Sequence, residues 1–210
     1  MIECEGHIDG NFERFMLVAW SFAAFIAIRL ALEGADSLRL FTLHPLFAAV
    51  AVTLASWAIA SVQTAKPPHA GIASHRLLHA LAMVAFSVAF TAIYINKNNY
   101  GKEHFLTWHS WAGLASVSLY PMVSTVGYLI LTFPGLFGGE KVVRVYFYPM
   151  HRVAGYMTLL TVWSTIVLGM RTVGWLSPVS GLLVTVAVID VFRRIELRRI
   201  LPISGKSHAK

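Results

Sequence analysis

The sequence is poor in charge, in acidic residues and in cysteine. Of its 210 residues only 13% are charged, 10 are Asp or Glu, and the single cysteine is Cys4. One cysteine excludes an intramolecular disulfide. No carboxylate, serine or cysteine accompanies the histidines of the apolar segments in a pattern that supports acid–base or nucleophilic chemistry. We therefore predict no catalytic side chains of these kinds.

Apolar sequence dominates what remains. Hydrophobic residues make up 57% of the chain, against roughly 45–50% in soluble domains. Barrel strands are ruled out because they are about 10 residues long and alternate in polarity. Short polar connectors leave no room for a second domain. The sequence predicts one all-α integral membrane domain over residues 1–210, with six transmembrane helices near the ~20 residues that cross a bilayer, at 15–32, 41–63, 74–95, 105–133, 146–170 and 176–192.

The basic residues indicate the orientation of the chain. A net charge of +7 would favour nucleic acid as the partner of a soluble protein. Here the basic residues flank the apolar stretches, and most lie on the face that holds both ends of the chain. The positive-inside tendency places both termini in the cytoplasm. We expect contact with membrane lipid and none with nucleic acid.

Four histidines stand near the starts of four separate apolar stretches: His44, His75, His109 and His151. Successive membrane helices run in opposite directions, so these residues alternate between the two membrane faces. His44 and His109 then meet near one face, and His75 and His151 near the other. Two facing imidazoles are what a six-coordinate haem iron needs. The spacing predicts a central bundle of helices two to five that holds two haems b.

Other readings of these histidines stay open. A single histidine in a membrane helix is more often an interhelical hydrogen-bonding group than a ligand, but an unpaired polar group costs several kcal/mol in hydrocarbon, and four at matched depth indicate a shared purpose. A proton or metal transporter would also use intramembrane histidines. That reading requires acidic partners inside the helices, and Asp190 and Glu196 near the chain's end are nearly the only candidates.

Two glycines follow histidines at helical spacing. His109 and His151 both begin the pattern H-x-x-A-G, which places Gly113 and Gly155 one turn further on the same face. A glycine there leaves a gap in which a flat macrocycle can lie against the helix. The alternative is that these glycines let two helices approach closely.

Two further histidines have open roles. His79 lies one turn after His75 on the same face, and the pattern alone does not decide which of the two is the ligand. His104 precedes the fourth apolar stretch, where we expect a position at the surface or near a haem propionate.

Four motifs together resemble the cytochrome b561 family: His44-Pro45, HRLLH at 75–79, HSWAG at 109–113, and R-x-x-x-x-P-x-H from Arg144 to His151. The similarity covers about residues 41–170, the expected haem-binding core. The run GKEHFLTWH at 101–109 is similar to the short "domain-containing" branch of that family. The resemblance implies six helices and two haems b, with helix two paired to helix four and helix three to helix five. It also implies His75, not His79, as the ligand, because the family interval measured back from His109 ends there.

The same resemblance implies a function. Family members are transmembrane ascorbate-dependent reductases, so we expect a cytoplasmic ascorbate donor, an outer acceptor such as monodehydroascorbate or a ferric chelate, and a homodimer. Bis-histidine ligation leaves the iron without an open position, which favours electron transfer over oxygen chemistry. A haem-bearing membrane anchor for a partner reductase is the alternative. Arg144 matches a family ascorbate contact, and other basic residues would complete an anion site beside it: Arg76, Arg152, Lys66 and Lys141.

The chain departs from the family at two places. Members often carry Lys or Arg two residues before the helix-three ligand, where this chain has Ala73. Some place a histidine in the loop between helices three and four to contact substrate, where this chain has Lys97 and Asn98.

Overall fold

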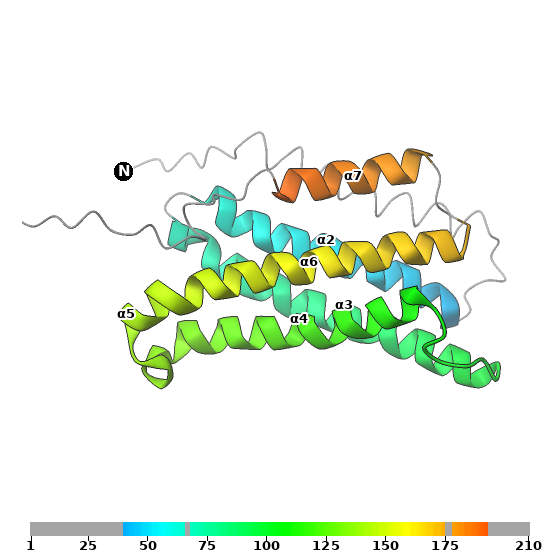
Figure 1. Ribbon diagram of the computed structural model, residues 1–210, viewed down its shortest axis with the longest axis horizontal. Coiled ribbons are helices and arrows are strands. Elements are labelled where there is room, and N and C mark those ends of the chain that lie inside the picture. Colours follow the sequence, from blue (N-terminus) through cyan, green and yellow to red (C-terminus); the bar gives the residue numbers. More distant parts are fainter. Residues whose placement is uncertain (1–39, 66–67, 175–177, 193–210) are drawn as a thin grey trace, which may run out of the picture.

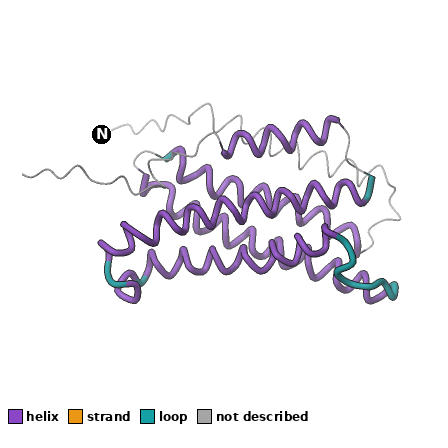
Figure 2. The backbone as a smooth tube through the Cα atoms, in the orientation of Figure 1, coloured by secondary structure: helices purple, strands orange, loops and turns teal. Residues whose placement is uncertain are grey.

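The structure is a computed structural model, and it describes residues 40–65, 68–174 and 178–192. In this part of the chain all regular structure is helical (Figures 1 and 2). The long helices are α2 (Leu40–Thr64), α3 (Ile72–Asn99), α4 (Trp108–Thr132) and α6 (Tyr148–Thr172). The shorter elements are the 3₁₀ turns Pro68–Gly71 and Pro134–Phe137, α5 (Glu140–Val142), the π-helical turn Val143–Phe147, and α7 (Pro178–Phe192).

Four segments of the described chain are long and apolar enough to cross a membrane: Leu40–Gln63, Ile72–Asn99, Trp108–Thr132 and Glu140–Thr172. They coincide with four of the expected spans, which confirms the all-helical membrane fold in its central part. The expected first span, 15–32, and both chain ends lie outside the described residues. The expected last span corresponds to α7, which has 15 residues, fewer than the ~20 that a crossing requires. The total of six spans stays a prediction.

The four long helices form two closely packed antiparallel pairs (Figure 1). Helix α2 packs on α3 through buried alanines, including Ala51 and Ala58 on α2 and Ala82 and Ala89 on α3, all at most 4% exposed. Small side chains let two helix backbones approach closely within a membrane. Helix α4 packs on α6, where the buried side chains are larger and include Leu159, Val162 and Trp163. The two pairs then face each other, so the residues of interest lie between them.

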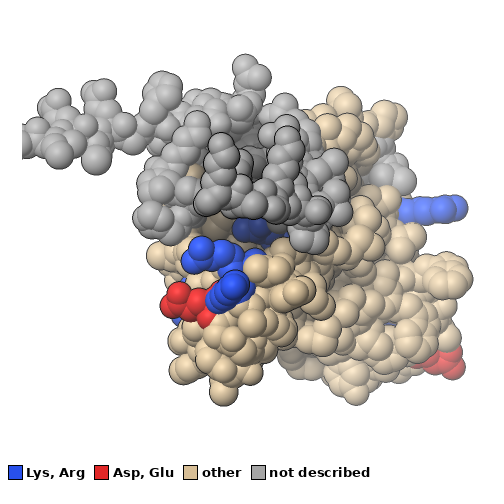
Figure 3. Space-filling model, turned by 60° about the vertical axis from the view of Figure 1, so that its left-hand side comes forward, with Lys and Arg blue, Asp and Glu red and all other residues tan. Residues whose placement is uncertain are grey.

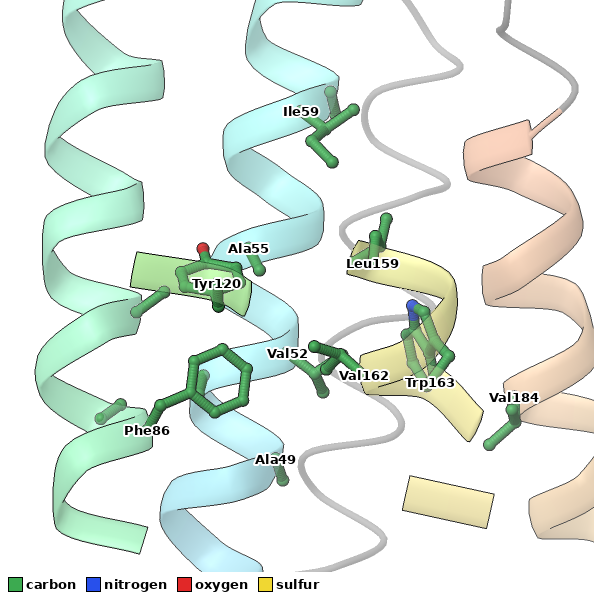
Figure 4. Packing of buried hydrophobic residues seen from close by; sticks show 14 of the residues in the cluster. Ala49, Val52, Ala55, Ile59, Phe86, Tyr120, Leu159, Val162, Trp163 and Val184 are labelled. Atoms are coloured by element: carbon green, nitrogen blue, oxygen red, sulfur yellow. The ribbon is translucent and has the colours of Figure 1, made fainter. Parts of the chain in front are cut away.

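A band of larger side chains fills the centre of the bundle. Figure 4 shows Phe86 and Tyr120 side by side, and Val52 beside Val162. The rings of Phe86 and Tyr120 meet edge to face at 4.9 Å between centroids, a favourable aromatic geometry. Tyr120 and Phe86 also line two different cavities of the bundle.

Local sequence explains how α4 and α6 begin. Thr107 caps α4, because its hydroxyl accepts a hydrogen bond from the Ser110 backbone N–H at 3.2 Å. Helix α6 has Pro149 in its first turn, where the missing N–H is harmless. The π-helical turn just before it joins α5 to α6. Each helix therefore starts a turn or less before the histidine it carries, which fixes the depth of His109 and His151.

Candidate functional site

The structure brings the four histidines together as two pairs. His44 on α2 faces His109 on α4 with ring centroids 5.9 Å apart, and His75 on α3 faces His151 on α6 at 6.4 Å. Two metal–imidazole bonds of about 2 Å each, together with the half-widths of the two rings, span roughly 6 Å. Each pair is therefore spaced as two axial ligands of one metal would be. This is the pairing that the alternation of helix direction predicts.

Three of the four imidazoles are oriented by backbone carbonyls. The Nδ1 atom of His44 bonds Ala89 O at 3.0 Å, and that of His75 bonds Ala58 O at 2.8 Å. His109 Nδ1 bonds the carbonyl of Thr165 at 3.0 Å. A carbonyl only accepts, so each Nδ1 carries the proton and each Nε2 keeps its lone pair. A neutral imidazole held in this tautomer is the usual form of a histidine metal ligand.

The bonds of α2 and α3 are reciprocal, and the reason lies in the sequence. The interval from His44 to Ala58 along α2 equals the interval from His75 to Ala89 along α3. In an antiparallel pair of helices, this equal spacing brings each histidine opposite the acceptor of the other helix. The two hydrogen bonds between α2 and α3 are therefore related by an approximate local two-fold symmetry.

Helices α4 and α6 repeat the same spacing. Thr165, the acceptor for His109, follows His151 at this same interval, and Val123 holds the corresponding place after His109. The His151 Nδ1 atom is buried and has no hydrogen-bond partner among the described residues. Of the two equivalent histidine–carbonyl hydrogen bonds, helices α4 and α6 therefore form only the one between His109 and Thr165.

Two glycines that sequence reasoning missed hold the rings of α4 and α6. A Cβ added to Gly169 would stand 2.8 Å from Cε1 of His109, and one added to Gly127 would overlap the ring of His151. The interval from His151 to Gly169 equals that from His109 to Gly127. Each helix thus supplies a histidine near its start and, further along, the glycine that admits the histidine of its neighbour.

Gly113 and Gly155, the glycines that the sequence analysis singled out, do not contact a histidine ring in this way. Nothing in the described chain lies within 4 Å of a Cβ built on Gly155, and the nearest atom to one built on Gly113 is Thr165 Cγ2 at 3.7 Å. Both glycines line cavities. At Gly155 this geometry favours the gap interpretation over close helix contact.

Each histidine pair lies on the wall of a cavity. The cavity beside His75 and His151, called here the His75 cavity, measures about 1040 Å³. The one beside His44 and His109, the His44 cavity, measures about 300 Å³. Small-molecule and cofactor sites are concave, mostly apolar and roughly 300–1,000 Å³ in volume. Among the described residues, no three His, Cys, Asp or Glu side chains lie close enough to hold a metal ion.

Basic side chains gather around the His75 cavity. Arg76, Arg144 and Arg152 line it, and the Arg76 guanidinium lies 4.5 Å from the centre of the Tyr128 ring. Figure 3 shows Lys and Arg side chains grouped on this end of the bundle. Lys141 is exposed on α5 and does not line the cavity. Lys66, the last member of the expected anion site, lies outside the described residues.

His79 has a separate partner from His75. Its Nδ1 atom is hydrogen-bonded to the Tyr120 hydroxyl, and its ring meets that of His75 edge to face at 4.4 Å. His75, in contrast, faces His151 and bonds a backbone carbonyl. The geometry therefore supports His75 as the ligand and places His79 beside it on the wall of the same cavity.

The His44 cavity has polar residues of its own. His104 Nε2 bonds Asn98 Oδ1 at 2.8 Å, and the His104 ring stacks on Tyr94 at 4.5 Å. Lys97, whose ammonium donates to the Glu103 carbonyl at 2.9 Å, lines the same cavity. Sequence reasoning expected His104 at the surface or near a haem propionate, and the structure places it on the cavity wall.

The pairing, the cavities and the motifs all agree with one family. The family model described as eukaryotic cytochrome b561 matches residues 43–177. The chain belongs to the cytochrome b561 family. Its members are integral membrane proteins that bind haem b.

Curated relatives have related names. A cattle protein named transmembrane reductase CYB561D2 is 27% identical over 79% of this chain and 74% of its own length. An Arabidopsis thaliana protein named transmembrane ascorbate ferrireductase 1 is 27% identical over 73% of this chain and 63% of its own. The maize ascorbate-specific transmembrane electron transporter 2 is 25% identical over 57% of this chain. The chain spans about half, 51%, of that maize protein's length.

Proposed function

We propose that this cytochrome b561 holds two haems b and carries single electrons across the membrane. His75 and His151 would be the axial ligands of one haem, and His44 and His109 those of the other. The opposed rings at 6.4 and 5.9 Å are the observation that carries the proposal. Haem with both axial positions filled supplies one-electron exchange without an open site for oxygen. The chain orients three of the four imidazoles through backbone carbonyls and encloses both sites in largely apolar walls.

The donor is proposed to be ascorbate, bound at the mouth of the His75 cavity. Two of the relatives are named for ascorbate. Ascorbate is an anion, and Arg76, Arg144 and Arg152 line this cavity. Guanidinium groups bind anions through charge-assisted hydrogen bonds. Lys66 and Lys141 would add positive charge around the entrance.

The acceptor is proposed to bind on the opposite side, beside the His44 cavity. Lys97 and His104 line this cavity, and they offer hydrogen-bond donors to an anionic or chelated acceptor. Monodehydroascorbate and a ferric chelate both carry oxygen atoms that can accept such hydrogen bonds. A relative named as a ferrireductase supports the second.

Haem counting tests the proposal directly. Purified protein should contain two haems per chain and show a low-spin b-type spectrum. His75→Ala or His151→Ala should each remove one haem, and so should His44→Ala or His109→Ala. His208→Gln, a histidine change in the C-terminal tail, is the matched control and should keep both. A folded, colourless protein would refute the proposal.

Reconstitution tests the direction of transfer. With ascorbate enclosed in liposomes and a ferric chelate or monodehydroascorbate outside, the proposal expects acceptor reduction that depends on the protein. Rates measured with each acceptor in turn show which of the two the protein uses. Reduction that persists in the His75→Ala variant would exclude passage through both sites.

A further inference from the structure

Arg76 and Tyr128 contact each other at the His75 cavity. The Arg76 guanidinium lies over the Tyr128 ring, 4.5 Å from its centre, within the distance at which a cation and an aromatic face attract. Arg76 is on α3 and Tyr128 on α4, so the contact joins one helix of each antiparallel pair. Both residues line the cavity. The proposed function uses the charge of Arg76 but gives Tyr128 no role.

The sequence places this contact beside the histidine pair. Arg76 directly follows His75, and Tyr128 directly follows Gly127, the glycine whose added Cβ would overlap the ring of His151. The two backbone segments that position the histidine rings therefore also carry the two members of the cation–π pair. An anion bound by Arg76 would lie on the same cavity as both histidines.

A guanidinium that lies over a ring keeps its hydrogen-bond donors available. Its N–H groups point outward in the plane of the group, whereas the ring attracts the cation from one face. Tyr128 can therefore hold Arg76 without using the donors that bind an anion. No Asp or Glu belongs to the described lining of this cavity, so no carboxylate of that lining competes for these donors.

An arginine that is held in advance binds an anion more tightly than one that moves freely. A long side chain loses rotamer freedom when it binds, and this loss weakens the binding. Arg76 is exposed, so that without a contact its side chain would sample many rotamers. The contact with Tyr128 makes part of this loss before the anion arrives.

Resting on the proposed function, we propose that Tyr128 is a positioning residue of the ascorbate site, whose ring holds the Arg76 guanidinium at the His75 cavity with its N–H edge directed to the anion. Tyr128 acts through Arg76 and does not itself bind ascorbate. The competing role is that of an interfacial anchor, because tyrosines near the ends of membrane helices lie at the level of the lipid headgroups. An anchor makes no use of Arg76, so the two roles differ in their effect on ascorbate binding.

Equilibrium binding to the reduced protein tests this proposal apart from electron transfer. Protein kept reduced with dithionite cannot take an electron from ascorbate, so dialysis against radiolabelled ascorbate measures the affinity alone. Tyr128→Leu should weaken binding by about three- to ten-fold, whereas Tyr128→Phe, which keeps the ring, should bind nearly as the wild type does. Tyr146→Leu is the matched control, at an exposed tyrosine that does not line the cavity, and should leave the affinity unchanged.

A double-mutant cycle tests whether the ring acts through Arg76. With Arg76→Gln in place, adding Tyr128→Leu should weaken ascorbate binding no further, because the group that the ring holds is gone. Equal weakening in both backgrounds would show a role that is independent of Arg76 and would overturn the inference. Wild-type affinity in Tyr128→Leu would also overturn it and would favour the interfacial anchor.

Haem content, measured in the same samples, shows which variants are folded. Tyr128→Met is a second variant without the ring, and the affinity is compared in whichever of the two keeps the haem content of the wild type. Loss of haem in both would assign the ring to stability and would overturn the inference. A wild-type protein that binds haem but no ascorbate would defeat the proposed donor. Ascorbate binding that is equal with and without the ring defeats this inference alone.

Discussion

Gly169 lies directly against the ring of His109, so that a Cβ at this position would stand 2.8 Å from the ring carbon Cε1. The same relationship joins Gly127 to His151 in the opposite direction along the helix pair. A histidine ring in van der Waals contact with a helix backbone has little freedom to turn. The contact with Gly169 and the hydrogen bond to the Thr165 carbonyl together set the direction in which Nε2 of His109 points.

Gly169→Ala should therefore displace His109 and weaken the site of the His44 cavity. Overpacking of this kind costs about 1–3 kcal/mol, and the ring must shift because the contact is with its rigid edge. We expect the variant to bind about one haem per chain, measured by haem-to-protein ratio. Gly135→Ala is the control, because nothing in the described chain lies within 4 Å of its added Cβ. Wild-type haem content in both variants would show that Gly169 does not position the ring.

Part of this site was predictable from the sequence. The pairing of His44 with His109 and of His75 with His151 follows from helix direction, because the order of helices along the chain fixes which ends share a membrane face. Four of the expected spans match the long helices because the length of an apolar stretch fixes where a membrane-crossing helix can lie. Gly155 was predictable because it follows His151 by four residues and so lies on the same face of the helix.

The rest depends on how two helices are placed side by side. Gly169 and the carbonyl of Thr165 contact His109 from another helix, 56 residues away in the case of Thr165. The equal intervals from histidine to acceptor and from histidine to glycine were present in the sequence, but their meaning requires the antiparallel register. The Tyr120 partner of His79, 41 residues away, is hidden in the same way.

Tyr120→Phe should destabilise the protein and keep both haems. Removing the hydroxyl leaves His79 Nδ1 buried without the partner it has now, and an unsatisfied buried polar group costs about 1–3 kcal/mol. The free energy of unfolding should fall by this amount while the haem-to-protein ratio stays at two. Tyr94→Phe, at an exposed tyrosine, is the matched control and should change stability little.

His79→Asn tests the choice between the two histidines of α3. His75 is the residue that faces His151, so the His79→Asn variant should keep both haems and the low-spin spectrum. His75→Asn should lose one haem. The reverse outcome, with haem lost only in His79→Asn, would make His79 the ligand.

Arg144→Gln should weaken the use of ascorbate without loss of haem. Losing a charge-assisted hydrogen bond to an anion costs about 1.5–3 kcal/mol, which corresponds to a rise of about ten-fold or more in the half-saturating ascorbate concentration. The rate of haem reduction against ascorbate concentration measures this. Arg171→Gln, in the last turn of α6 at the far end of that helix, is the control. Equal effects of the two changes would indicate a general charge effect and no binding site.

Changes beside the His44 cavity should affect the acceptor alone. Lys97 and His104 line that cavity and do not line the His75 cavity. The His104→Gln variant should thus be reduced by ascorbate at the wild-type rate, but pass electrons to a ferric chelate or monodehydroascorbate several-fold more slowly. Stopped-flow mixing separates the two steps, because reduction is followed before the acceptor is added and reoxidation after it. Since the two sites lie at opposite ends of the bundle, slower reduction by ascorbate in this variant would show that His104 acts on the donor side, and would remove it from the proposed acceptor site.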